Sequence, residues 1–170
     1  MTIFTIGHST RPIQTFLQLL AAHHIQHLAD VRTVPRSRHN PQFGSQQLAE
    51  SLREAGIHYT HMPGLGGLRR PRFDSVNAGW RNLSFRGYAD YMETPVFEEA
   101  LARCIELAAD ERVVLMCAEA VPWRCHRSLI ADALLVRGID VCEISSETRA
   151  RPHVLTPWAR VEGTHIIYAA

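Results

Sequence analysis

The chain has 170 residues, of which 46% are hydrophobic and 21% are charged, and its formal net charge is +1. These values are typical of a globular protein with one domain and an ordinary hydrophobic core. No apolar run approaches the roughly 20 residues that cross a bilayer. The sequence contains no lysine, which excludes lysine Schiff-base chemistry and the lysine of a Walker phosphate-binding loop.

The first half of the chain alternates between strand and helix patterns. Ile3–Ile6 predicts a first strand, and because the opening MTIFTIGHST lacks the basic region of a signal peptide, we expect a cytoplasmic protein. The elements expected next are a helix containing Ile13, Phe16, Leu17, Leu20 and Ala21, a strand at His27–Val31, a loop at Arg32–Gly44, a helix from Ser45 to Ala55 that Gly56 ends, and a strand at 57–61.

The second half continues this alternation after a long irregular stretch. Residues 68–87 are rich in arginine, and we expect an excursion whose aromatic residues Phe73, Trp80 and Phe85 pack against the domain. The elements expected after it are helical structure from Tyr88–Met92, a helix capped by Thr94 that runs through Phe97–Ala108, a strand at Arg112–Cys117, a helix from near Pro122 or Trp123 to Arg137, a strand at Ile139–Ile144 and a last strand at Thr164–Tyr168.

This alternation predicts a single α/β domain over residues 1–170, with three Rossmann-like layers, a mainly parallel sheet of about five strands and helices on both faces. Sheets of this kind bind ligands beyond the carboxyl ends of their strands. Polar residues follow three of the predicted strands, namely His8, Ser9, Thr10 and Arg11, then Arg32, Arg36 and Arg38, and finally Cys117, Glu119, Arg124, Cys125, His126 and Arg127. We expect these three clusters to converge on one site.

Arginine is concentrated in the middle of the chain. From Arg32 to Arg86 there are nine arginines and three acidic residues, so the rest of the chain is net acidic. This asymmetry suggests a cationic face that meets an anionic ligand or nucleic acid. Arginines next to Phe73, Trp80 and Phe85 are also suited to stacking on bases. A compositional bias of the genome, or solvated arginines over a small aromatic core, explains the same pattern without a function.

The strand-end residues have candidate chemical roles. Arg32, Arg36, Arg38 and Arg127 are candidate anion ligands, and Ser9, Thr10 and Asp30 belong to the same candidate binding set. His8 with Glu119 is a candidate acid–base pair, and Cys117 or Cys125 is a candidate nucleophile. His126 is a further catalytic candidate, but it needs a partner other than Cys125 because neighbours in a helix point apart. A histidine that only bonds a backbone carbonyl is the structural alternative.

The four cysteines are expected to stay reduced, with Cys104 and Cys142 as small core residues. Asp30-Val31-Arg32, together with a cysteine at a strand tip, resembles rhodanese-like domains. The segment CAEAVPWR departs from the amide-rich loop of those enzymes, because it carries a carboxylate and a proline. The cysteines and histidines lack the two close pairs of a structural zinc site, so no metal site is predicted, and no cofactor is identified.

Several motifs together resemble one protein family. They are GHSTRP, LADVRTVPRSRHNPQF, the glycine turn LGG, YADYM with TPVF, and CAEAVPWRCHRSLIADAL. They are similar to the bacterial proteins grouped as domain of unknown function 488. The resemblance implies a single α/β domain with Rossmann-like layering and supplies no established reaction. Its characteristic positions coincide with the polar strand-end residues.

The leading hypothesis is an enzyme with an arginine-rich pocket at the strand ends, acting on a phosphate- or nucleotide-bearing substrate. The first alternative is a nucleic-acid-binding module that uses the arginines between Arg32 and Arg86. The second is a rhodanese-like sulfurtransferase, or a thiol or metal redox protein, built on Cys117 and Cys125. The expected partner is an anionic small molecule or a nucleic acid rather than a membrane, and no oligomeric state is predicted.

Overall fold

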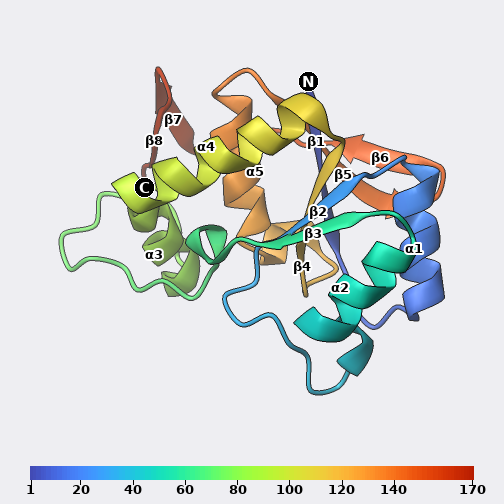
Figure 1. Cartoon of the computed structure of the whole chain (residues 1–170). Coiled ribbons are helices and arrows are strands. Elements are labelled where there is room, and N and C mark those ends of the chain that lie inside the picture. Colours follow the sequence, from blue (N-terminus) through green and yellow to red (C-terminus); the bar gives the residue numbers. More distant parts are fainter.

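A six-stranded sheet in the order β3-β2-β4-β1-β5-β6 forms the centre of the molecule, as the computed structural model of residues 1–170 shows (Figure 1). The first five strands in chain order run parallel, and β6 pairs antiparallel with β5. The strands are β1 (Thr2–Gly7), β2 (His27–Asp30), β3 (His58–His61), β4 (Val113–Cys117), β5 (Asp140–Ser146) and β6 (Arg149–Pro152). The α/β class and the mainly parallel sheet predicted from the sequence are confirmed.

Helices cover both faces of this sheet (Figure 1). One face carries α1 (Ile13–Ala22) and α2 (Ser45–Glu54), and the other carries α3 (Leu83–Tyr91), α4 (Pro95–Asp110) and α5 (Arg127–Leu135). Side chains of β4 alternate between the two cores, because Val114 and Met116 pack with α1 and α2 whereas Val113, Leu115 and Cys117 pack with α3 to α5. Cys117 therefore lies on the α5 side of the sheet.

Two helices begin at positions other than those expected. Helix α5 begins at Arg127, because Pro122–Arg124 forms a separate 3-10 turn and Cys125 has an extended backbone with φ −129° and ψ 143°. Helix α3 begins at Leu83 rather than near Tyr88. The side chain of Asn82 accepts hydrogen bonds from the amides of Ser84 and Phe85, which is the usual N-terminal cap.

The arginine-rich excursion before α3 is tied to the domain by a buried carboxylate. Asp90 accepts hydrogen bonds from the Arg72 amide, the Ser75 hydroxyl and the Asn77 side chain at 2.8, 2.6 and 2.7 Å. Aromatic packing adds to this contact, since Trp80 lies against Phe85, Trp158 and Tyr168. The expectation for Phe73 is wrong, because this side chain is fully exposed.

The C-terminal region forms more strands than the sequence indicated. Besides β6, a separate hairpin pairs β7 (Ala159–Glu162) with β8 (His165–Tyr168). The buried carboxylate of Asp132 on α5 fixes this region by accepting hydrogen bonds from His153, Thr156 and Tyr168. None of the helices combines the length and the hydrophobicity that a membrane span requires.

Candidate functional site

The carboxyl ends of β1, β2 and β4 lie next to one another at the centre of the sheet. The amides of His8 and Ser9 donate to the carbonyls of Cys117 and Ala118 at 2.8 and 3.0 Å. This approach requires glycine at the end of β1, because a Cβ atom on Gly7 would overlap the carbonyl oxygen of Glu119. The three polar clusters singled out in the sequence are therefore spatial neighbours.

A buried ion pair organises the segment after β2. The Nε and Nη2 groups of Arg32 donate to the two carboxylate oxygens of Asp30 at 2.9 and 2.7 Å, and Asp30 is fully buried. The Tyr59 hydroxyl also donates to Asp30 at 2.6 Å, and burial together with this carboxylate raises the pKa of Tyr59. Asp30 has no exposed surface and therefore acts by positioning Arg32 rather than by contacting a ligand.

His8 is a buried, neutral ring between two fixed partners. Its Nδ1 donates to the Ser9 carbonyl at 2.8 Å, and its Nε2 faces Nη1 of Arg32 at 3.4 Å. Burial lowers the pKa of His8, and the positive charge of Arg32 lowers it further. No hydrogen bond joins His8 to Glu119, whose carboxylate accepts from the Val121 amide at 3.1 Å. The acid–base pair expected from the sequence is absent in this arrangement, because both ring nitrogens have other neighbours.

The sulfur atoms of Cys117 and Cys125 are in direct contact, which the expectation of four separate thiols did not foresee. Their Cα atoms are 7.6 Å apart, beyond the roughly 4.4–6.8 Å that is usual for a disulfide. The structure thus joins the two sulfur atoms across an unusually wide Cα separation, and the cysteines that remain separate thiols are Cys104 and Cys142. Both side chains are almost fully buried, and both line a pocket.

Arg127 contacts both sulfur atoms, through its amide and its guanidinium group. Its guanidinium donates to both carboxylate oxygens of Glu143, to the carbonyls of Glu119 and Ala120, and to Cys117 Sγ at 2.7 Å. All five N–H groups of the guanidinium therefore have acceptors within the chain. Arg127 has no donor left for a substrate, so it holds the loop after β4 and contacts Cys117 instead of acting as the predicted anion ligand.

His126 lies over the second thiol. Its Nε2 donates to the Val31 carbonyl at 3.0 Å, which leaves the Nδ1 lone pair 3.7 Å from Cys125 Sγ. Burial lowers the pKa of His126 to about 4, so the ring is neutral at pH 7. The glycine turn makes room for it, because a Cβ atom on Gly67 would lie 2.9 Å from Nδ1. The turn thus serves close packing of His126.

These groups line a pocket of about 450 Å³, which we call the strand-end pocket. Its floor contains Cys117 and Cys125, and its rim carries Arg36 and Arg124, whose guanidinium groups form no hydrogen bond or ion pair within the chain. Arg32 also lines it. Val34, Leu68 and Phe85 line it as well, so the pocket offers both cationic and apolar groups.

The other predicted residues lie beside this pocket. Ser9 and Thr10 line a shallow neighbouring hollow with His8, and Glu119 belongs to both depressions. Arg38 is exposed and lines neither of them. The predicted set is therefore brought to one region, but only Arg32, Arg36, Cys117, Glu119, Cys125 and His126 line the pocket itself.

Most arginines between Arg32 and Arg86 have partners within the chain. Arg72 pairs with Glu93 and Asp74, Arg69 lies 3.7 Å from the centre of the Tyr91 ring, and Arg86 donates to backbone carbonyls. The guanidinium groups without a partner are those of Arg36, Arg38, Arg70 and Arg81. The charge asymmetry of the sequence therefore overstates the free positive charge of this stretch.

Arg124 belongs to the third polar cluster of the sequence but had no predicted role, and Gly67 was not expected at the site. Arg124 stands one position before Cys125, yet only the 3-10 turn of Pro122–Arg124 directs it to the pocket rim. Its position beside Cys125 in CAEAVPWRCHR was the feature of the sequence that could have marked it as a pocket residue. For Gly67 the signal was the LGG turn itself, whose packing partner is 59 positions further along the chain.

The fold and the site together define an α/β domain with a pocket of arginines, thiols and a histidine at the strand ends. A family model described as "Domain of unknown function DUF488" matches residues 12–134. The chain belongs to this family. The matched range includes the segments around Asp30 and Cys117, and it begins after the GHST motif. No curated protein and no solved structure matches the chain.

The low pKa of His126 predicts a pH-dependent stability. The unfolded ring takes up a proton below about pH 6.5, whereas the folded ring does so only near its pKa of about 4. The free energy of unfolding is therefore highest above about pH 6.5, where the ring is neutral in both states. It falls as the pH decreases toward 4, because only the unfolded ring binds a proton there. Urea unfolding should show that the free energy of unfolding of the wild type falls by about 1–2 kcal/mol from pH 7 to pH 5. It should fall by less in His126→Asn.

An exposed histidine provides the control for this measurement. His39→Asn should retain the wild-type loss between pH 7 and pH 5, because His39 is exposed. Equal losses in the wild type and in His126→Asn would contradict the assignment of a buried neutral ring.

Proposed function

We propose that the protein is an enzyme that binds a small phosphate-bearing molecule, of nucleotide size, in the strand-end pocket and acts on it with a thiol. The observation that carries this proposal is the pairing of free guanidinium groups with thiols around one pocket. Arg36 and Arg124 have no partner within the chain, and Cys117 and Cys125 form the floor below them. An anion held by the two arginines would lie above the sulfur atoms.

The charges around the pocket favour an anion. The charge of Arg32 is balanced by Asp30 and that of Arg127 by Glu143, so neither pair adds net charge. Glu119 is the one acidic residue that lines the pocket, so the two positive charges of Arg36 and Arg124 exceed the negative charge there. Guanidinium groups bind phosphate oxygens with two parallel hydrogen bonds, which suits an exposed pocket rim.

The apolar side chains of the pocket support a ligand with a second, less polar part. Val34, Leu68 and Phe85 line the pocket together with the arginines. A volume of about 450 Å³ lies within the range of roughly 300–1,000 Å³ that is usual for small-molecule sites. A phosphate joined to a planar ring system, as in a nucleotide, meets both requirements.

The surroundings of the thiols support a nucleophilic role. The guanidinium of Arg127 donates a hydrogen bond to Cys117 Sγ, and such a bond supports a nucleophilic sulfur. The neutral His126 ring presents its Nδ1 lone pair toward Cys125 Sγ at 3.7 Å and can accept a hydrogen bond from a thiol there. One sulfur atom is thus next to a guanidinium group and the other next to an imidazole nitrogen.

Substitution of the rim arginines tests the proposal. A thermal-shift screen of inorganic phosphate and nucleotides should give a stabilising ligand. Arg36→Ala and Arg124→Ala should each weaken its binding by about 10- to 100-fold, since each removes hydrogen bonds to a charged group. Because both side chains are exposed and unpaired, the melting temperature without ligand should not change.

Arg103→Ala is the matched control, because Arg103 is exposed on α4 and does not line the pocket. This variant should bind the ligand as the wild type does. The proposal fails if no phosphate-bearing compound raises the melting temperature, or if both rim variants bind as tightly as Arg103→Ala.

The contact between the two sulfur atoms supports a second candidate function, a thiol–disulfide redox centre. Under this alternative, oxidation joins Cys117 and Cys125 and leaves Cys104 and Cys142 as thiols. Thiol titration of denatured protein should then give four thiols after reduction and two after treatment with oxidised glutathione. Four thiols under both conditions would exclude a redox role for the pair.

A further inference from the structure

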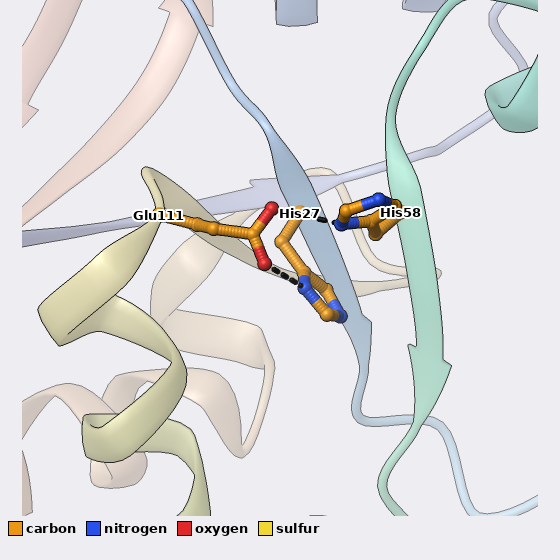
Figure 2. Close-up of side chains that lie close together, drawn as sticks. All are labelled: His27, His58 and Glu111. Carbon is orange, nitrogen blue, oxygen red and sulfur yellow. Dashed lines mark hydrogen bonds and ion pairs between the residues drawn. The ribbon is translucent and has the colours of Figure 1, made fainter.

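A second cluster of chemically reactive side chains lies at the opposite end of the sheet from the strand-end pocket. His27 and His58 are the first residues of β2 and β3 and are paired in register. Glu111 directly follows α4, at the turn that leads into β4. Figure 2 shows the two imidazole rings and the carboxylate turned toward one another.

The donor atoms of this cluster are close and well directed. The Nδ1 of His27 lies 3.0 Å from one carboxylate oxygen of Glu111, and the Nδ1 of His58 lies 2.8 Å from the other. All three ligand atoms lie within 4.8 Å of one another. Ligand atoms of a tetrahedral zinc ion are ~3.3 Å apart when each is about 2.0–2.1 Å from the metal. The two nitrogen–oxygen distances are close to this value.

The ring of His27 is held in the orientation that a metal ligand needs. Its Nε2 is 2.7 Å from the Thr60 hydroxyl, so the second nitrogen has a partner and Nδ1 is directed at Glu111. Metal-bound histidines generally use their other ring nitrogen in such a hydrogen bond. His27 is almost fully buried, whereas 72% of the His58 side chain is exposed and free to adjust to an ion.

No arginine neutralises Glu111. The neighbouring Arg112 donates to the His23 carbonyl and stacks on the Phe4 ring, and thus turns away from the carboxylate. The basic groups beside Glu111 are the two imidazoles, whose Nδ1 atoms are its hydrogen-bond partners. A divalent cation satisfies the carboxylate and both Nδ1 atoms at once.

We propose that His27, His58 and Glu111 bind a divalent transition-metal ion of the zinc type. Two imidazole nitrogens and one carboxylate oxygen form a donor set that suits Zn²⁺, with water completing the coordination. The ion would join the starts of β2 and β3 to the turn between α4 and β4. Since β3 is an edge strand that pairs only with β2, this link would stabilise the edge of the sheet.

Zinc titration of the full chain without a histidine tag tests this proposal. After treatment with a chelator, isothermal titration should give one Zn²⁺ per chain and zinc should raise the melting temperature. His58→Asn and Glu111→Gln should each weaken the affinity at least tenfold. His58 is exposed and Glu111→Gln preserves the side-chain shape, so both variants should fold, and their melting temperatures without metal report on this.

Two controls separate this site from other metal-binding groups. His39→Asn, an exposed histidine outside the cluster, should bind zinc as the wild type does. The double variant Cys117→Ser/Cys125→Ser should also retain the site. The proposal is overturned if no zinc binds, if binding is unchanged in both cluster variants, or if the cysteine variant abolishes it. Loss of the visible absorption of bound Co²⁺ in His58→Asn gives an independent measurement.

Discussion

The buried ion pair between Asp30 and Arg32 is the interaction on which the site depends. It holds the chain where β2 ends, directs the third guanidinium nitrogen toward His8, and receives the Tyr59 hydroxyl. Removing one member of such a pair leaves an unbalanced buried charge and usually costs about 3–5 kcal/mol. The backbone of this segment also accepts the hydrogen bond that fixes His126, through the carbonyl of Val31. One ion pair thus links the β1, β2 and α5 sides of the pocket.

The arginines of the site divide into two groups with different tasks. Arg32 and Arg127 are buried, bind carboxylates with two hydrogen bonds each, and build the loops that carry the reactive groups. Arg36 and Arg124 are exposed and have no partner in the chain. Burial therefore separates the structural arginines from those that we propose bind a ligand, and Arg127 contacts Cys117 without occupying the pocket rim.

The sequence predicted the sheet, the helices and the convergence of the strand ends, because alternating apolar periodicity fixes the order of elements and parallel strands share one carboxyl edge. It could not predict which arginines are free, since Glu93 and Glu143 become partners of Arg72 and Arg127 only through contacts between separate segments. Pro122 is typical of the first turn of a helix, but here it begins a short 3-10 turn, so the start of α5 was predicted too early. His27, His58 and Glu111 had no motif to mark them, because 84 positions separate His27 from Glu111.

The central claim, a phosphate-bearing ligand lying directly above two pocket thiols, is tested most directly by chemical protection. The rates at which iodoacetamide modifies each cysteine are measured by peptide mass spectrometry, with and without a saturating phosphate-bearing ligand. Modification of Cys117 and Cys125 should slow markedly when the ligand is present, while that of Cys142, which lies on β5 outside the pocket, should not change. Equal rates at the two pocket thiols with and without ligand would contradict the account.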